Sequence, residues 1–276
     1  MCLIWGSTWL VIRWGLTDMP PLTSLVGRLV VAWLALAAIT PALQRRAPAL
    51  APPHWLSVST GTLSFALSYT VVYYTETIIP SGLAAVLWAT YPLFLAILAR
   101  FFLGEKLGFQ KAIGLLVAFA GIVTLFGTDV PALGTGALAA GLIFLVSPLS
   151  AAINTVIVKT HAKGTSSAIL TRNALFVGAC ETAVLALLFE NTAQTEWTAR
   201  AVVSVTYLAI LGTAVGFLLW FWALEHMPAS RLALISYISP VIAVALGHLL
   251  MAEPLTSTLA VGTSLVLGGV VIAARA

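Results

Sequence analysis

The sequence predicts an all-α integral membrane protein in which ten transmembrane helices form two inverted repeats of five helices each. Three observations carry this prediction. The 276-residue chain is 61% hydrophobic and only 8% charged, whereas soluble domains hold about 25% charged residues. Nine polar or Pro/Gly-rich breaks divide the chain into apolar runs. A pattern of prolines, glycines and a glutamate also recurs at a fixed distance along the chain. Such a composition leaves too little polar surface for a protein that faces water on all sides.

The apolar runs have the length of membrane spans. A transmembrane helix needs about 20 mostly apolar residues. The breaks therefore predict ten helices, at residues 1–17, 20–42, 54–76, 81–103, 108–126, 134–159, 166–189, 199–224, 229–250 and 256–274. No break is long enough to hold a soluble domain, so we expect a single integrated membrane domain.

Lysine and arginine are concentrated in alternate loops, which predicts the orientation. The even-numbered breaks and their flanks hold Arg45, Arg46, Arg100, Lys106, Lys111, Lys159, Lys163 and Arg231. The odd-numbered breaks hold only Arg200, beside Asp18, Glu76, Asp129, Glu190, Glu196 and Glu253. Since basic loops remain in the cytoplasm, both termini are predicted to be cytoplasmic.

The repeat pairs the fourth and fifth helices with the ninth and tenth. At an offset of 148 positions the matched residues are Pro80 and Pro228, Pro92 and Pro240, Glu105 and Glu253, Gly114 and Gly262, and Gly121 and Gly269. A shift of five helices is odd, so the second copy is inverted in the membrane. The sequence therefore predicts one repeat over residues 1–126 and an inverted repeat over residues 134–276. Such repeats are typical of transporters, which bind substrate near the midplane; a duplication without a transport role is the alternative.

Several functional classes lack their motifs in this sequence. No G-x-x-x-x-G-K-[ST] motif is present, so an ATP-driven step is not indicated. The two cysteines, Cys2 and Cys180, and the four histidines form no metal-site spacing. The basic balance, a net charge of +4, follows from membrane topology and does not require a nucleic-acid partner. We therefore expect no enzyme activity, no catalytic residues, no metal and no cofactor.

Two stretches resemble a known family. The segment WGSTWLVIRWG, Trp5 to Gly15, and the pattern of Pro92, LGEKL at 103–107, Gly114 and Gly121 are similar to the ten-helix drug/metabolite transporter superfamily, EamA-type. The aromatic-rich helices most resemble bacterial exporters of aromatic amino acids and methionine. This resemblance implies a basket-like, multi-pass inner-membrane exporter. Its central cavity would be lined by helices 1–4 and 6–9, with helices 5 and 10 peripheral.

Charged residues well inside the predicted spans are the first functional candidates, namely Arg28, Arg172 and Glu181. Arg28 lies about 12 Å into the second helix and Arg172 about 9 Å into the seventh, which are counterparts in the two repeats. A charge facing lipid costs about 2.5–3.5 kcal/mol, so each arginine either ties the helices together or contacts a substrate carboxylate. We expect at least one to serve the substrate path. Glu181 is the one clearly intramembrane carboxylate; it either forms a fixed buried pair or binds a proton or an amine. We do not expect it to be an obligatory proton carrier.

Prolines within the spans mark possible bends. Pro92, Pro148 and Pro240 each remove a backbone donor and free the carbonyl four residues earlier. They are predicted to kink their helices, either as static bends around the site or as hinges. The loop glutamates Glu105 and Glu253 are predicted to stabilise the N-termini of the helices that follow them.

Aromatic and small polar residues are candidates for the cavity wall. The aromatic candidates are Tyr69, Tyr73, Trp88, Tyr91, Phe217, Trp222 and Tyr237. The polar candidates are Ser7, Thr8 and Asn154, which could instead bond neighbouring helices. Trp5, Trp33, Trp55 and Trp197 are assigned to the membrane interface or the lipid-facing surface. The aromatic group favours a pocket for apolar or aromatic side chains.

Together these features predict an exporter of small metabolites, namely amino acids with apolar or aromatic side chains, working by alternating access. The alternatives are a broad-specificity drug exporter and, from another class, a membrane protein without a transport role. A cation pump needs an intramembrane carboxylate to neutralise its desolvated substrate, and the first helix offers Arg13 instead. The expected partners are a small-molecule substrate and the lipid bilayer, and ten helices suffice for a functional monomer.

Overall fold

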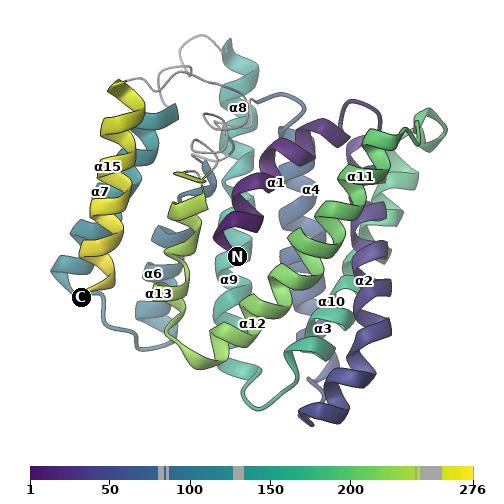
Figure 1. The fold of residues 1–276 in the computed structure, drawn as a ribbon, viewed down its shortest axis with the longest axis horizontal. Helices are drawn as coiled ribbons and strands as arrows, with labels where there is room; N and C mark the ends of the chain where they lie inside the picture. Colours follow the sequence, from purple (N-terminus) through teal and green to yellow (C-terminus); the bar gives the residue numbers. More distant parts are fainter. Residues whose placement is uncertain (80–83, 85–86, 127–133, 240, 243–256, 276) are drawn as a thin grey trace.

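The computed structural model describes residues 1–79, 84, 87–126, 134–239, 241–242 and 257–275. Over these ranges the regular structure is helical, with an isolated bridge between Leu50 and Thr165 joining two loops. The helices lie side by side across one layered body (Figure 1). The pair α7 and α15 forms one end of this body, α2 and α10 form the other, and α1 and α9 lie between them (Figure 1).

The helix bounds follow the apolar runs of the sequence. In chain order the elements are α1 (Cys2–Gly15), α2 (Pro21–Arg46), α3 (His54–Thr60), η1 (Gly61–Leu67), α4 (Ser68–Thr75), α6 (Tyr91–Phe102), α7 (Phe109–Phe126), α8 (Gly134–Phe144), α9 (Val146–His161), α10 (Ser167–Phe189), η3 (Thr192–Gln194), α11 (Ala199–Tyr207), η4 (Leu208–Val215), α12 (Gly216–His226), α13 (Ala229–Leu232) and α15 (Ser257–Ala274). Helix α2 continues through Pro41 to Arg46, a few residues beyond the predicted end at 42.

Several of these helices have the dimensions of membrane spans. Within the described part of the chain, four helical runs are long and apolar enough to cross a bilayer: Pro21–Arg46, Gly136–His161, Ser167–Phe189 and Ala199–His226. Shorter apolar helices cover Tyr91–Phe102, Phe109–Thr124 and Ala260–Ala274. Large apolar side chains on the outer faces are solvent-accessible, for example Phe101, Leu187 and Phe189, each at least 70% exposed. An apolar exterior of this kind is what a lipid environment requires.

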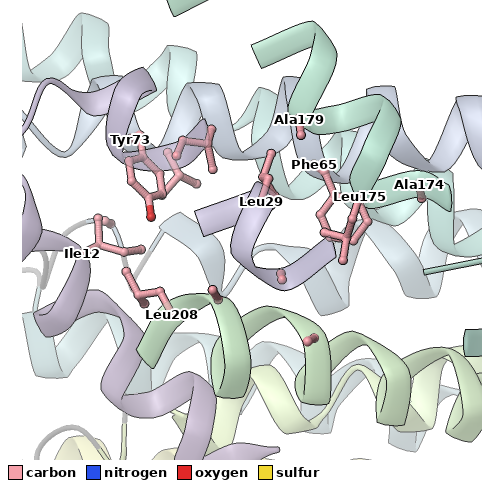
Figure 2. Close-up of a cluster of buried hydrophobic side chains, with 14 of the residues drawn as sticks. Ile12, Leu29, Phe65, Tyr73, Ala174, Leu175, Ala179 and Leu208 are labelled. Atoms are coloured by element: carbon pink, nitrogen blue, oxygen red, sulfur yellow. The ribbon is translucent and has the colours of Figure 1, made fainter. Parts of the chain in front are cut away.

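The largest core cluster joins both halves of the chain. It brings together buried residues of α1, α2, η1, α4, α8, α10 and η4. Ile12, Tyr73 and Leu208 converge from three different elements, and Phe65 packs beside Leu175 (Figure 2). Because these contacts link residues far apart in sequence, neither half builds its core alone.

Two long helices each contain a π-helical segment at matching positions. Segment η1 spans Gly61–Leu67 between α3 and α4, and η4 spans Leu208–Val215 between α11 and α12. The two segments correspond at the 148-residue offset of the sequence repeat, within one residue at their starts. A π-turn widens the helix and often accompanies a functional site. The sequence analysis expected uninterrupted α-helices here.

Helices α7 and α15 make a reciprocal antiparallel contact. A Cβ added to Gly114 would lie 2.7 Å from the Gly269 carbonyl oxygen, and one added to Gly269 would lie 2.6 Å from that of Gly114. A Cβ on Gly121 would lie 2.7 Å from the carbonyl oxygen of Gly262. Gly114 thus contacts Gly269, the repeat counterpart of Gly121, and Gly121 contacts Gly262, the repeat counterpart of Gly114. This exchange is the pattern of a two-fold contact. Only glycine permits this close backbone approach.

Two glutamates stabilise helix N-termini in the opposite half of the chain. Glu190, after α10, accepts bonds from the backbone N–H groups of Leu22 and Thr23 at 2.7 and 2.8 Å, at the start of α2. Glu105 accepts from the N–H groups of Ala229 and Ser230 at 2.7 and 3.2 Å, at the start of α13. The expected role of Glu105 is therefore corrected: it binds a helix N-terminus, but that of α13 rather than of the helix that follows it. Glu253 lies outside the described residues.

An ion pair joins the loop between α1 and α2 to the first turn of α11. Asp18, between α1 and α2, accepts from the guanidinium of Arg200, with 2.8 Å between Arg200 Nε and Asp18 Oδ2, and from the Thr198 hydroxyl. These hydrogen bonds, Arg200's first, lower the pKa of Asp18 to about 2. Asp18 therefore stays ionised at neutral pH, and the pairing weakens as the pH falls towards that value.

The α7–α15 contact predicts a site-specific effect of one methyl group. Gly269→Ala is expected to destabilise the fold by about 1–3 kcal/mol, because the methyl group meets the α7 backbone. Gly268→Ala is the matched control, since nothing lies within 4 Å of a Cβ at that position. Both substitutions gain the same helix propensity. Thermal unfolding of the purified proteins in detergent measures the difference, and equal melting temperatures would contradict the close contact.

Candidate functional site

A cavity lies among the central helices. The space open to the centres of water-sized molecules is about 90 Å³. Its lining residues are Trp5, Thr8, Trp9, Ile12, Arg28, Ser64, Ser68, Tyr69, Val72, Trp88, Tyr91, Ala151, Asn154, Thr155, Phe217, Trp220, Phe221, Ser236 and Ser239. They come from α1, α2, η1, α4, α6, α9, α12 and the segments around Trp88 and Ser236–Ser239. The cavity is thus built by both halves of the chain.

The charge in the cavity wall is Arg28 of α2, which is only 3% exposed. Its Nε donates to the Thr213 hydroxyl at 2.8 Å. Its two terminal nitrogens donate to the hydroxyls of Tyr73 at 3.3 Å and Tyr69 at 3.1 Å. The guanidinium carbon also lies 4.4 Å from the centroid of the Tyr69 ring, a cation–π contact. Three oxygen partners from α4 and η4 therefore fix the orientation of the guanidinium.

The geometry leaves donor capacity on Arg28. A guanidinium carries five N–H groups, and three of them point at the oxygens of Thr213, Tyr73 and Tyr69. Each terminal nitrogen keeps one further N–H. Free guanidinium N–H groups of this kind can donate to the oxygens of a carboxylate. Because Arg28 lines the cavity, a carboxylate placed there could reach it.

Asn154 of α9 supplies an acceptor. The residue is 1% exposed and its Nδ2 donates to the Ser64 hydroxyl of η1 at 2.8 Å. Its Oδ1 is buried and has no hydrogen-bond partner among the described residues. A buried polar atom without a partner costs roughly 1–3 kcal/mol. A ligand that donates a hydrogen bond would remove that cost.

Aromatic rings are the most numerous side chains in the remaining wall, followed by uncharged hydroxyl groups. The Trp5 ring lies 5.5 Å from Trp220 and 5.8 Å from Phe217. Trp88 and Tyr91 stack with 5.9 Å between their centroids and 11° between their planes. Trp5 Nε1 donates to the carbonyl oxygen of Gly212 in η4 at 3.0 Å, so its polar edge is satisfied while its ring faces apolar neighbours.

The structure brings seven of the expected residues to this cavity. They are Thr8, Arg28, Tyr69, Trp88, Tyr91, Asn154 and Phe217. Tyr73 does not line the cavity, but its fully buried side chain accepts a hydrogen bond from Arg28. Arg28 and Arg172 were predicted to lie on counterpart helices, and their surroundings differ. The Arg172 guanidinium donates to its neighbour Asn173 at 2.8 and 3.0 Å and is not part of the cavity wall.

Four other expected residues lie away from the cavity. Trp222 is 55% exposed on the outer face of α12. The Tyr237 hydroxyl donates to the Leu115 carbonyl at 3.2 Å, in a cluster that packs on α7 and α15. The Ser7 hydroxyl bonds that of Tyr207 at 2.6 Å, the helix–helix role left open for it. Glu181 accepts from the Thr62 hydroxyl at 2.7 Å and forms no ion pair with any described residue.

The sequence analysis missed part of the wall, including Trp5, which it assigned to the membrane surface. Trp5, Thr8, Trp9 and Ile12 lie at i, i+3, i+4 and i+7 and form one face of α1. This helical spacing is visible in the sequence and could have identified them. The hydroxyls of Ser64, Ser68, Thr155, Ser236 and Ser239 were missed as well.

Two of the three prolines predicted to kink their spans lie directly after an interruption of the helix. Helix α6 begins at Tyr91, so Pro92 lies in its first turn after a turn at Ala89–Thr90. Pro148 lies in the first turn of α9, after an interruption at Leu145. In both places the proline lacks only a donor that the first turn leaves unused. Pro240 lies outside the described residues.

Comparison with known proteins places the chain among transporters. The profile described as "EamA-like transporter family" matches residues 1–127 and 138–275. The chain is 30% identical over 269 residues to "Uncharacterized transporter YoaV" of Bacillus subtilis, covering 97% of this chain and 92% of that protein. It is 29% identical to "Uncharacterized inner membrane transporter YedA" of Escherichia coli K12, covering 92% and 81%. A solved crystal structure shares the fold with a TM-score of 0.82 at 20% identity, covering 99% of this chain and 93% of the other.

The positions of two tryptophans predict different losses of stability for the same substitution. Trp5→Phe is expected to lower the free energy of unfolding by about 1–3 kcal/mol, because it leaves the buried Gly212 carbonyl oxygen without its donor. Trp222→Phe, on the outer face of α12, is expected to change it by less than about 0.5 kcal/mol. Thermal unfolding in detergent followed by circular dichroism compares them. A larger loss for Trp222→Phe would contradict both placements.

Proposed function

Because the chain belongs to the EamA-like transporter family and is a multi-pass membrane transporter of small molecules, we propose that it exports zwitterionic amino acids with apolar or aromatic side chains. The proposed location is the bacterial inner membrane, because its Escherichia coli relative YedA is named as an inner membrane transporter. The observation that carries the proposal is the composition of the cavity wall. One buried guanidinium, and one amide oxygen without a partner among the described residues, lie in a wall whose other members are aromatic, apolar or uncharged hydroxyl side chains.

The carboxylate of the substrate is assigned to Arg28. A carboxylate that leaves water for the membrane interior loses several kcal/mol of hydration, and only a well-placed cation or helix N-terminus offsets that loss. Arg28 is held by Thr213, Tyr69 and Tyr73, so little further ordering is needed when a ligand binds. The remaining N–H groups on its terminal nitrogens provide the two donors.

The ammonium group is assigned to Asn154 and the aromatic rings. Oδ1 of Asn154 is a free acceptor, and a cation over the face of a tryptophan or tyrosine gains about 0.5–2 kcal/mol. The substrate side chain then lies among Trp5, Phe217 and Trp220. Since a water needs roughly 10–15 Å³ in this measure of volume, a cavity of about 90 Å³ suits a small metabolite better than a bulky drug.

The same wall disfavours a pump for cationic drugs. Such a pump requires a carboxylate to neutralise its desolvated substrate, and the described lining contains neither aspartate nor glutamate. Its one charged member, Arg28, would repel a cation. A drug exporter therefore remains the second candidate, and its expected substrates would be neutral lipophilic drugs.

Transport by alternating access of two inverted five-helix repeats is part of the proposal. Three findings support it: the reciprocal glycine contact between α7 and α15, the π-segments at matching positions, and the two separate family matches. The proposed arrangement has ten spans with both termini in the cytoplasm. A functional monomer is also part of the proposal, since ten helices suffice to surround a site.

Flux in liposomes that contain only this protein tests the proposal. We expect countertransport of labelled phenylalanine and methionine, competition by their unlabelled forms, and little flux of glutamate or of tetraphenylphosphonium. Liposomes without protein are the control. Flux of tetraphenylphosphonium without amino-acid flux would replace the exporter of amino acids by the drug exporter.

The two span arginines predict a substrate-dependent difference. Arg28→Gln is expected to lower phenylalanine flux about ten- to hundredfold, the value of a charge-assisted hydrogen bond, while flux of phenylalanine amide, which lacks the carboxylate, is largely retained. Arg172→Gln, the matched control on the counterpart helix, should change both fluxes less than about twofold. Gel filtration and circular dichroism establish folding of each variant. Equal loss of both fluxes in folded Arg28→Gln would return this arginine to a structural role.

A further inference from the structure

A carboxyl group is buried at the end of α4, the helix whose tyrosines bind Arg28. Glu76 directly follows the last residue of α4, and the sequence analysis placed it in a loop. It is nevertheless only 1% exposed. Both of its carboxyl oxygens are buried and neither has a hydrogen-bond partner among the described residues. Burial without a partner strongly disfavours the ionised form of a carboxyl group.

Glu76 lies on the helix face that holds Arg28. Tyr69, Tyr73 and Glu76 are at i, i+4 and i+7, so they follow one another along one face of α4 and its end. The hydroxyls of the two tyrosines accept bonds from Arg28. The charges of Arg13 and Arg28 both act on the Glu76 carboxyl. Arg13, which is exposed, is fixed because it donates to the backbone carbonyl oxygens of Glu76 and Ile79 at 3.3 and 3.2 Å.

The charged groups that face Glu76 come from two helices. Arg13 belongs to α1 and Arg28 to α2, and on its own helix the titratable neighbour is Tyr73. Helix α8, which also packs on α4, contains no charged residue. Helix α9 holds its basic residues, Lys159 and His161, at its far end. The proton affinity of Glu76 is therefore set by burial, which raises it, against two guanidinium groups, which lower it.

We propose that Glu76 is a proton-binding site coupled to the occupancy of Arg28. A carboxylate ligand at Arg28 offsets part of the guanidinium charge, so the proton affinity of Glu76 rises and the carboxyl takes up a proton. By linkage, protonated Glu76 leaves Arg28 free to attract the ligand, and both couplings have the same magnitude. The identity of the ligand rests on the proposed function, whereas the coupling between Arg28 and Glu76 does not.

The coupling makes a pH gradient a factor in transport. Ligand affinity is highest at low pH, where Glu76 is protonated in both states. It falls as the pH rises between the midpoint of the free protein and that of the complex, by at most about tenfold per pH unit for a single proton. Above both midpoints it is constant again. Ligand and proton thus bind together, so a pH difference across the membrane biases net flux from the more acidic to the more alkaline side, and net export depends on the substrate gradient as well.

Calorimetry measures the linked proton directly. Phenylalanine is titrated into the intact protein in buffers of different ionisation enthalpy, from which the protons taken up per ligand are obtained. We expect an uptake of a substantial fraction of one proton in the wild type, none in Glu76→Gln, and the wild-type value in Glu181→Gln. Glu181 is the matched control because its carboxylate has a partner, Thr62, and does not line the cavity. Uptake that persists in Glu76→Gln, or is lost in Glu181→Gln, overturns the proposal.

Infrared difference spectroscopy tests the coupling without any ligand. The C=O stretch of protonated carboxyl groups is followed through a pH titration of wild type, Arg28→Gln and Glu76→Gln. We expect a titrating band that Glu76→Gln removes and that Arg28→Gln shifts to higher pH. A band that Glu76→Gln retains, or a midpoint that Arg28→Gln leaves unchanged, overturns the proposal. If phenylalanine and methionine do not bind, the proposed function fails and this titration alone decides the proton site. If Glu76→Gln does not fold, Glu76→Asp keeps a carboxyl and is expected to move the midpoint without removing the band.

Discussion

A single buried guanidinium organises the centre of this protein. Arg28 is almost fully buried in a wall without any other charged residue, where an unpaired charge costs several kcal/mol. Its oxygen partners are two tyrosines one helical turn apart on α4 and a threonine in η4. The Thr213 hydroxyl itself donates to the Leu208 carbonyl oxygen at 2.9 Å, five residues back, so the partner is oriented by the π-segment. The position of α2, the face of α4 and the widened turn of η4 therefore depend on one another.

The apolar runs and the repeat were sufficient to predict an all-helical membrane protein and the general place of Arg28. The helix faces were harder to predict, and Trp222 shows why. Phe217, Trp220 and Phe221 lie at i, i+3 and i+4, share one face of α12 and line the cavity, whereas Trp222 lies on another face and is exposed. The sequence analysis selected aromatic residues by the helix that holds them and not by helix face, so it included Trp222 and omitted Trp220.

Other errors arose from rules that treat residues by class. Trp5 was assigned to the membrane surface because tryptophan is enriched there, although its spacing with Thr8 and Trp9 indicates one common helix face. Glu76 was counted as a loop charge because it ends an apolar run. Burial at a helix end depends on what packs over it, here Arg13 and the core cluster around Tyr73. That information is tertiary and cannot be obtained from one segment of sequence.

The exchange of helix-capping glutamates between the halves has a consequence for biogenesis. The chain is made from the N-terminus, so α2 enters the membrane long before Glu190 is synthesised, and its first backbone N–H groups must meanwhile bond water or lipid headgroups. The start of α13, in contrast, emerges when Glu105 is already in place. The second half can therefore receive its capping glutamate as soon as α13 forms. The first half receives its own only after Glu190 has been synthesised. Maturation of the first helical hairpin is thus delayed until most of the polypeptide has left the ribosome.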